Sequence, residues 1–473
     1  MPPSTTRASP AKDRAGPGSA YQTAASAQKD GGRPGKASGR RISLFSLALA
    51  ASATATLLLA AWCLGGGRGG GHTAPLLPTF RSINGTLHPR AGPVSPAEVA
   101  ASAAEAAAMF GTAFDAYLTH AFPHDDLKPL SCSGGDSQGG VALTLIDSLS
   151  TALLLGDAPR LGAGLAAAAS TVGGRRVLDF DVPARVHVFE LTIRALGGLL
   201  SVHAALTRPG NGALLASLPP GTPPPAVLLA AAVDLGRRLL PAYDTPTGLP
   251  LSWVNLRSGP IPEGTRLTCA ACAGTAFMEM AALTAATGDG RFAAAARRAA
   301  FALAARADPA TGLVGNTLSV DTGAWARTDA GVGAGIDSYY EYLLKSYLLT
   351  GDEAWLGAWA AAHAALMRWC NAPTLPPGRG GDRSVPPPWR VDVDMGTGAL
   401  AKPWVSSLAA FFPGLQALAG QTRAAAAGHA AWAATWARFS GLPEAVDALT
   451  GTVRHPTMGG YPLRPELAES TYA

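Results

Sequence analysis

From about Ser95 to its end, the chain repeats one pattern of hydrophobic and polar residues. Ala- and Leu-rich stretches, in which apolar residues recur every three or four positions, alternate with short breaks that contain glycine. This spacing places the apolar residues along one side of an α-helix. The alternation of single apolar and polar residues that is typical of β-strands is scarce. The pattern therefore predicts an all-α fold.

Several of the breaks resemble one another. Residues 155–157 (LGD), 287–289 (TGD) and 350–352 (TGD) each place a glycine where one helix ends and an aspartate where the next begins. Weaker analogues follow Leu206 and Leu418. Successive breaks are 51 to 81 residues apart, which suits two helices and two loops. We therefore expect a repeated hairpin of two helices.

Two helices indicate how these hairpins are arranged. Residues 185–206 are apolar on nearly every side, which is typical of a helix that is buried all round. The helix after Thr287 carries Arg297 and Arg298 on one face, as an outer helix would. An inner and an outer layer favour a closed α/α barrel over an open superhelix. Long loops rich in Gly and Pro would then form a pocket at one end.

The N-terminal part of the chain has a different composition. Residues 1–41 lack periodicity and are interpreted as a disordered basic tail. Residues 42–66 contain no charge and include the 21 apolar residues Leu44–Leu64, which as a helix span about 30 Å, the thickness of a bilayer core. The length of this run and of the leader before it favours an uncleaved signal anchor. The excess of basic residues before the run predicts a cytosolic N-terminus and a lumenal remainder. A cleaved signal peptide and a chloroplast transit peptide are the alternatives.

Residues 67–100 are interpreted as a Gly- and Pro-rich lumenal stem, in which Asn84 begins a glycosylation sequon. The net charge of +5 is confined to the tail: eight basic and two acidic residues precede Ile42, so the residues after the tail sum to −1. The chain also shows no zinc-finger spacing, basic helix or RNA-binding signature. These observations argue against a nucleic acid partner.

The five cysteines predict no disulfide framework. Cys269 and Cys272 have the CxxC spacing, but no second CxxC or His pair completes a zinc site. We interpret the pair as a packing feature or an incidental disulfide.

Acidic residues within apolar helical runs stand out because only 15% of the chain is charged. A buried carboxylate without a partner is costly or takes up a proton. Glu190 lies between two apolar residues of an apolar helix, with Arg194 one turn later. An ion pair between these two residues is the alternative to a functional role.

Two further helices carry acids on one face. Asp337 and Glu341 are four residues apart, and this like-charge pair disfavours itself unless a proton, cation or ligand relieves it. A helix N-cap is the alternative for Asp337. Glu466 and Glu469 repeat the motif three residues apart.

Glu279 is a lone acid in an apolar helix, and Glu444, which follows a proline, is most simply a helix-start residue. Several helix-borne acids at one end of a barrel suit glycoside hydrolysis, in which one carboxyl protonates the leaving oxygen and another activates water. From the residues alone, a glycosidase and a lectin are both open.

At these residues the sequence resembles the class I α-mannosidases, glycoside hydrolase family 47, and within them the ER degradation-enhancing α-mannosidase-like proteins. The segment AFPHDDLKPLSC favours that branch over a Golgi processing mannosidase. The segments that carry the resemblance extend from about Glu105 to the end of the chain and are residues 121–132, 143–157, 188–203, 254–259, 268–280, 333–352, 407–416 and 461–472.

The resemblance implies an (α/α)7 barrel in residues 101–473, bound Ca2+, and inverting removal of α-1,2-linked mannose from high-mannose N-glycans on misfolded glycoproteins. It also implies a single-pass type II protein of the endoplasmic reticulum (ER) membrane, with ER redox or degradation partners. A lectin-like member that holds such glycans without cleaving them is the alternative. The acids that the resemblance makes catalytic are Glu190, Asp337, Glu444 and Glu466, with Glu466 as the base; the residues that it places around the sugar are Arg194, Glu279, Glu341 and Glu469.

The sequence departs from the family pattern at two places. Ser150 stands where a second aspartate is usual after Asp147. The chain also ends at Ala473, before the late segment whose threonine is the expected calcium ligand. We count about five of seven hairpins, so we expect either an incomplete gene model or an inactive product.

Overall fold

The computed structural model describes residues 94–372 and 389–473. These residues all belong to one of the two compact units of the chain, Leu44–Ala473. The predicted basic tail, the signal anchor and Asn84 lie outside the described residues.

The first described helix, α2 (Pro96–His120), begins at a capping box. The Ser95 hydroxyl accepts a hydrogen bond from the backbone N–H of Glu98, and the Glu98 carboxylate accepts one from the backbone N–H of Ser95. This arrangement satisfies two donors that the first helical turn otherwise leaves free. The helix therefore includes the last five residues of the stretch that we assigned to the stem.

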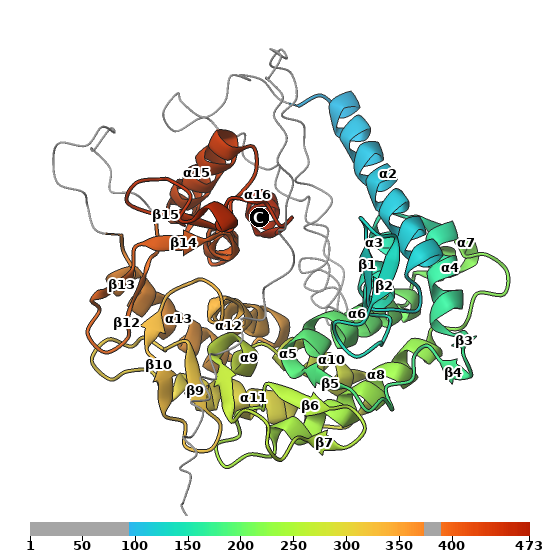
Figure 1. Cartoon of the computed structure of the whole chain (residues 1–473), viewed down its shortest axis with the longest axis horizontal. Helices are drawn as coiled ribbons and strands as arrows, with labels where there is room; N and C mark the ends of the chain where they lie inside the picture. Colours follow the sequence, from blue (N-terminus) through green and yellow to red (C-terminus); the bar gives the residue numbers. More distant parts are fainter. Residues whose placement is uncertain (1–93, 373–388) are drawn as a thin grey trace, which may run out of the picture. The chain divides into compact units, whose positions relative to one another are not determined.

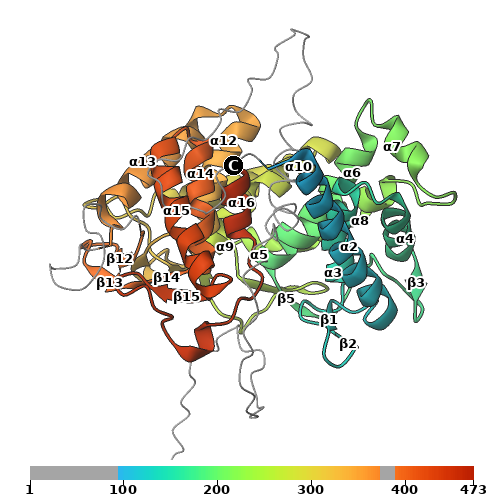
Figure 2. The same cartoon turned by 90° about the horizontal axis from the view of Figure 1, so that it is seen from above.

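Within the described residues, five helical hairpins follow one another, which confirms the predicted all-α fold (Figures 1 and 2). In each hairpin a first helix packs against a second. The first helices are α3 (Leu143–Leu154), α6 (Gly197–Thr207), α10 (Phe277–Thr287), α12 (Asp337–Thr350) and α14 (Phe412–Leu418), and the second helices are α4 (Ala158–Ala168), α8 (Ala226–Leu239), α11 (Arg291–Ala304), α13 (Glu353–Trp369) and α15 (Thr422–Phe439). The last helix, α16 (Glu466–Tyr472), packs against α14.

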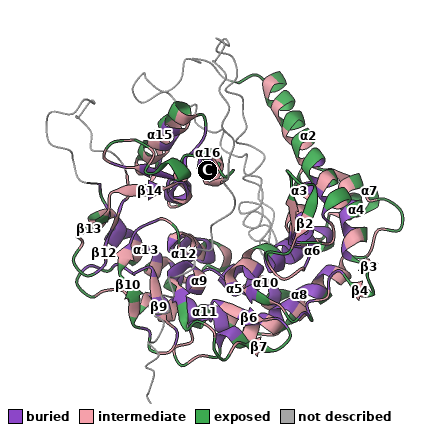
Figure 3. Ribbon diagram, viewed as in Figure 1, coloured by how far each residue is buried: buried purple, intermediate pink, exposed green. Residues whose placement is uncertain are grey.

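The first helices also contact one another in chain order, α3 with α6, α6 with α10, α10 with α12, and α12 with α14. They form the inner layer, because α6 buries eight of its 11 residues, whereas α15 buries only three of 18 (Figure 3). Arg297 and Arg298 of α11 are exposed, as predicted for an outer helix. The hairpins thus supply the two layers of an α/α barrel.

Glycine is the C-cap of two inner helices, as the breaks predict, and aspartate is the N-cap of α4 and α13 but not of α11, whose N-cap is Gly290. Gly288 and Gly351 are the C-caps of α10 and α12, with φ of 76° and 70°. A residue with a Cβ atom is strained in this left-handed conformation, so glycine is favoured. Asp352 then caps α13 by accepting a hydrogen bond from the N–H of Ala354.

The loops contain short strands that the sequence analysis did not predict. Two sheets of three strands lie beside inner helices. The first has the order β5 (Arg185–His187), β6 (Trp253–Asn255) and β7 (Gly259–Pro260). The second has the order β8 (Leu267–Cys269), β9 (Thr317–Ser319) and β10 (Trp325–Arg327). A third sheet joins β11 (Asp329–Ala330), β12 (Asp392–Asp394) and β13 (Leu400–Lys402). The remaining pairs are β1 (Asp126–Lys128) with β2 (Ser133–Gly135), β3 (Thr171–Val172) with β4 (Arg175–Arg176), and β14 (Trp404–Ser406) with β15 (Ala445–Asp447).

The sheets matter because several lead directly into inner helices. α5 (Val188–Glu190) follows β5 and continues through the π-helical turn η1 (Leu191–Leu196) into α6. α9 (Ala270–Gly274) follows β8, and the 3₁₀ turn η3 (Ser407–Phe411) follows β14. The other short helical segments are α7 (Gly212–Ser217), η2 (Leu240–Tyr243) and η4 (Pro456–Met458).

Candidate active site

The predicted acids cluster at one end of the inner layer. Because every hairpin reverses the chain, the inner helices run in the same direction and their N-terminal ends lie together. The positive end of each helix dipole stabilises a carboxylate there. The acids in or near the first turns of these helices are Glu190 of α5, Glu279 of α10, Asp337 and Glu341 of α12, and Glu466 and Glu469 of α16.

A buried lysine joins two of these acids. Lys345 of α12 is only 2% exposed, and its Nζ donates to Glu341 and, over 3.1 Å, to Glu469 of α16. Burial alone would lower the pKa of Lys345, but the two carboxylates raise it above its usual value. Lys345 is therefore the cation that relieves the like charges on α12. The sequence analysis missed it, although it lies one helical turn after Glu341.

Glu279 is the most deeply buried of the acids, at 3% exposure. The Tyr342 hydroxyl donates a 2.6 Å hydrogen bond to its Oε1. Its Oε2 is buried and has no hydrogen-bond partner among the described residues. Burial raises the pKa of Glu279 to about 7, although the bond from Tyr342 opposes this shift. Glu279 thus retains one oxygen for a proton or a ligand hydroxyl.

Asp337 is the first residue of α12 and does not act as its N-cap, which is Ile336. Its Oδ1 accepts hydrogen bonds from the backbone N–H of Ser338, at 2.8 Å, and from the Ser338 hydroxyl. The Ser338 hydroxyl in turn accepts a 2.9 Å hydrogen bond from Thr275, which follows α9. Burial raises the pKa of Asp337 to about 7. This network connects α9 to the carboxylate at the start of α12.

The same short helix carries the CxxC pair. Cys269 and Cys272 form a disulfide, as one of the two interpretations of their spacing expected. The backbone N–H of Ala271, between them, donates to the carbonyl of Gly335. The disulfide therefore lies in a turn that packs against the start of α12.

Glu466, at the start of α16, has one carboxylate oxygen without a partner. Its Oε2 is buried and accepts no hydrogen bond within the described part of the chain. Burial raises the pKa of Glu466 to about 7; Arg464 opposes the shift and Asp337 adds to it. The Asp337 carboxylate therefore disfavours ionisation of Glu466.

Glu444 lies in a different place from the one predicted. It immediately precedes strand β15, so the interpretation as a helix-start residue is wrong. The strand forms because Ala445–Asp447 pair with Trp404–Ser406 of β14. The Glu444 carboxylate accepts two hydrogen bonds from Arg464, at 2.9 and 2.6 Å. It therefore orients the guanidinium that lies two residues before Glu466.

This arrangement predicts a pH-dependent effect of replacing Arg464. The Arg464 cation lowers the pKa of both Glu466 and Asp337. An Arg464→Gln variant should therefore raise the pKa of each of these two carboxyls above about 7. If Glu466 acts as an ionised base, the acidic limb of the pH–activity profile moves to higher pH. Arg298→Gln, an exposed substitution, is the control. If Arg464→Gln left the acidic limb of the pH–activity profile unchanged, Arg464 would not influence the pKa of these carboxyls.

Glu190 forms the ion pair with Arg194 that the sequence analysis gave as the alternative to a functional role, with Arg194 Nε donating to Oε2 over 2.8 Å. Arg194 also lies 3.8 Å from Asp147 of α3, and burial raises the pKa of Asp147. The pair lies where α5 passes into the π-helical turn, and such turns are frequent at functional sites. Ser150, which replaces the usual second aspartate, is buried and donates to the backbone oxygen of Asp147.

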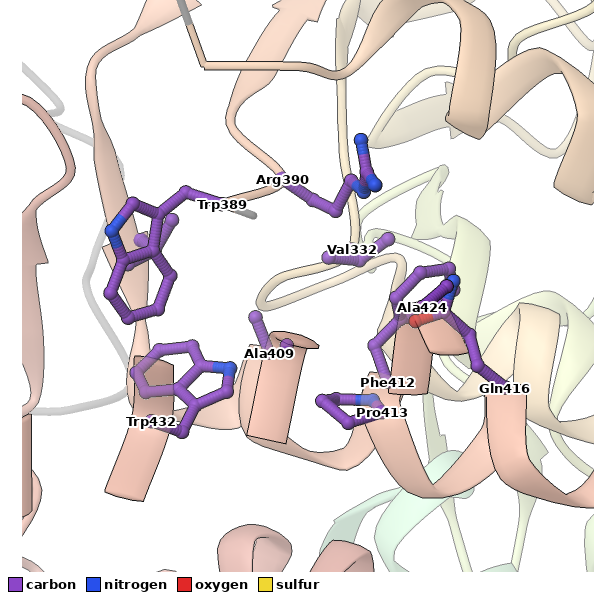
Figure 4. Close-up of a pocket in the computed structure, with 11 residues that line it drawn as sticks. Val332, Trp389, Arg390, Ala409, Phe412, Pro413, Gln416, Ala424 and Trp432 are labelled. Carbon is purple, nitrogen blue, oxygen red and sulfur yellow. The ribbon is translucent and has the colours of Figure 1, made fainter. Parts of the chain in front are cut away.

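A cavity of about 300 Å³ adjoins this pair. Its lining includes five residues that the sequence analysis did not select, Asp126, Ser137, Gln138, Leu143 and Thr144. A second cavity, shown in Figure 4, has a volume of only about 20 Å³ and no acidic residue in its lining. A space of that size holds roughly one water molecule. The larger cavity is therefore the candidate for a sugar.

Among the described residues, no cluster of acidic side chains is arranged as a metal site. Ca2+ takes about six to eight oxygen ligands, and no group of three or more His, Cys, Asp or Glu among the described residues is arranged to hold a metal ion.

Buried carboxyls with raised pKa values and unpaired oxygens are the acid–base groups that glycoside hydrolases use. The comparisons agree with this class. The chain belongs to glycosyl hydrolase family 47, whose family model matches residues 109–473.

The relatives of the chain include both α-mannosidases and degradation-enhancing proteins. It is 41% identical over 379 residues to alpha-mannosidase I MNS4 of Arabidopsis thaliana, covering 80% of this chain and 56% of that protein. It is 39% identical over 365 residues to human ER degradation-enhancing alpha-mannosidase-like protein 2, covering 77% and 58%. The chain thus spans less than two thirds of the length of these relatives.

The fold also matches that of a solved family member. The alpha-1,2-mannosidase from Trichoderma reesei superimposes with a TM-score of 0.64 at 26% sequence identity, covering 78% of this chain and 79% of that one. This similarity supports the α/α-barrel architecture that the inner and outer helices indicate.

Proposed function

We propose that the protein is an inverting α-1,2-mannosidase that removes terminal mannose from high-mannose N-glycans. The observation that carries this proposal is Glu466, a carboxyl with a pKa near 7 and a buried oxygen that no described residue binds. A general base is most effective when its pKa lies near the working pH. Asp337, with a pKa also near 7, influences its ionisation.

The proposed reaction assigns a role to each part of the cluster. Glu466 accepts a proton from water as the water oxygen bonds to the anomeric carbon of mannose. The glycosidic bond breaks on the opposite face, and the leaving oxygen takes a proton from Glu190 or Asp337. Attack from one face with departure from the other inverts the anomeric configuration.

The remaining polar groups position the sugar. Glu279, Glu341 and Glu469 offer acceptors for hydroxyl groups, and Lys345 keeps the last two in place. Glu444 fixes Arg464, whose charge holds the pKa of the acid pair near neutrality. Bound Ca2+ is part of the proposal because the family uses it.

Replacing Glu190 tests this assignment. In the presence of Ca2+, the purified protein should release mannose from a high-mannose oligosaccharide, and Glu190→Gln should lower the rate about 10²–10⁴-fold, the range for loss of a general acid, if Glu190 rather than Asp337 is the proton donor. Undiminished release by the variant would contradict the role of Glu190. Glycan binding by the parent protein without any release would instead favour the lectin-like alternative.

The location in the cell is also a proposal. We propose an ER protein of glycoprotein quality control, because several relatives bear the name of ER degradation-enhancing proteins. We further propose a type II anchor at residues 42–66, which lie outside the described residues. In the described part of the chain, one helical stretch, Val188–Thr207, is long and apolar enough to cross a membrane. It is an inner helix of the barrel, and 67% of its most apolar window is buried.

A further inference from the structure

The Cys269–Cys272 disulfide lies in the short helix α9, which packs against α12 (Figure 1). The backbone N–H of Ala271, between the two cysteines, donates a 2.9 Å hydrogen bond to the carbonyl of Gly335. Gly335 lies two residues before Asp337, the first residue of α12. The turn that the disulfide closes is therefore attached directly to the start of the helix that carries Asp337.

Two further contacts fix α9 in this position. The backbone N–H of Ala270 donates to the carbonyl of Asn316 over 2.9 Å, and the Asn316 side-chain amide donates to the carbonyl of Ala334 over 3.0 Å. At the other end of α9, a Cβ atom on Gly274 would lie 2.4 Å from the Tyr339 ring, so the two helices are in direct contact. Neither end of α9 can move without displacing residues of α12 or of the loop before it.

The residue that ends α9, Thr275, continues the connection as far as the carboxylate. Its hydroxyl donates to the Ser338 hydroxyl over 2.9 Å. The backbone N–H and the hydroxyl of Ser338 both donate to Asp337 Oδ1. These two bonds lower the pKa of Asp337 and so oppose the effect of its burial. The position of Thr275 thus influences both the orientation and the ionisation of Asp337.

The disulfide is the covalent link that closes this turn. α9 has only five residues, and a helix of that length is not stable by itself. The backbone N–H of Cys272 also donates to Cys269 Sγ over 2.9 Å. Both cysteines are partly exposed, so a small dithiol can reach them. Among the described residues, Cys132 and Cys370 are free thiols, which leaves this disulfide as the bond there that a reductant breaks.

We propose that the Cys269–Cys272 disulfide is a positioning element of the active site. It acts through Thr275 and Ser338, and it holds the Asp337 carboxylate in place. The proposal rests on the proposed function, in which Asp337 protonates the leaving oxygen or influences the ionisation of Glu466. When a dithiol reduces the disulfide, the S–S bond takes up two electrons and two protons to give two thiols, and the dithiol becomes a disulfide. The turn then loses its closure.

The test compares mannose release by the oxidised protein with release by the protein reduced with dithiothreitol, in the presence of Ca2+. Reduction should lower kcat about tenfold, the effect of losing a hydrogen bond, and leave KM unchanged, because proton transfer rather than sugar binding is impaired. The limb of the pH–kcat profile that Asp337 sets should move to higher pH, because the bonds from Ser338 lower its pKa. Reoxidation should restore both quantities.

Matched variants identify the residues that carry the effect. The double variant Cys269→Ser, Cys272→Ser should have the kcat of the reduced parent and should not respond to dithiothreitol. Thr275→Val should have this low kcat in both redox states, whereas Thr275→Ser, which keeps the hydroxyl, should restore the parent rate. Cys132→Ser removes an exposed free thiol and is the control, since it should respond to dithiothreitol as the parent does.

Hydrogen exchange of residues 333–342, measured by mass spectrometry, separates this proposal from the proposed function. Reduction should speed exchange there while α6 and α8 keep the protection of the parent. If no mannose is released in either redox state but exchange at 333–342 speeds on reduction, the positioning role stands and the hydrolytic function fails. Unchanged kcat and unchanged exchange would overturn the proposal. Faster exchange throughout the described helices would also overturn it, because the disulfide would then have only a general structural role.

Discussion

Replacing Glu466 by glutamine is expected to lower the rate of mannose release about 10²–10⁴-fold, the usual contribution of a general acid or base. Glutamine has the shape of glutamate but cannot accept the proton of the attacking water. The free energy of unfolding should not fall, because the variant removes a carboxyl whose ionised form burial disfavours. A time course of released mannose, together with thermal unfolding, measures both effects.

Glu353 provides the control for this variant. It is exposed in the first turn of the outer helix α13, so Glu353→Gln should release mannose at the parent rate. If Glu466→Gln retained more than half of the parent rate, Glu466 would not be the base. A large fall in its melting temperature would instead indicate a structural role.

Replacing Lys345 by methionine should produce the largest loss of stability. Removing one partner from a buried ion pair costs about 3–5 kcal/mol, and Lys345 serves two carboxylates. The loss in free energy of unfolding should be smaller at pH 5 than at pH 7.5, because Glu469 can then take up a proton. Burial already raises the pKa of Glu469. Urea unfolding at the two pH values measures the difference.

A triple variant separates charge from packing. Lys345→Met combined with Glu341→Gln and Glu469→Gln removes all three charges, and well-packed neutral replacements of buried ion pairs are often tolerated. Its free energy of unfolding should exceed that of the single variant, although sugar binding stays impaired. If the free energy of unfolding of Lys345→Met lay within about 1 kcal/mol of that of the parent, the loss would be that of an exposed ion pair. This result would contradict the argument from burial.

The helical hairpins could be predicted because their signals are local. An apolar period of three to four residues and the glycines at 288 and 351 act within one or two turns, and these glycines have the left-handed conformation that a C-cap favours. The Glu190–Arg194 pair is also local, four residues apart on one helix.

The short strands and the position of Glu444 could not be predicted in this way. β14 and β15 are each three residues long and come from distant parts of the chain, so neither shows an alternating pattern. The proline before Glu444 is equally compatible with a helix start. Tertiary pairing decides between the two.

Lys345 and Asp125 were missed for a different reason. Lysine and aspartate are rarely buried completely, so neither attracts notice in a sequence. Asp125 is buried because four backbone N–H groups converge on it, and Lys345 because α16 brings Glu469 to it. Both depend on contacts between residues that are distant in sequence.

The most direct test of the central proposal is the anomeric configuration of the mannose released first. Proton NMR follows the purified protein, with Ca2+, acting on an α-1,2-linked high-mannose oligosaccharide. An inverting reaction that uses Glu466 as base predicts β-mannose, which then equilibrates slowly with the α-anomer. Initial release of α-mannose, or glycan binding without any release, would contradict the proposal.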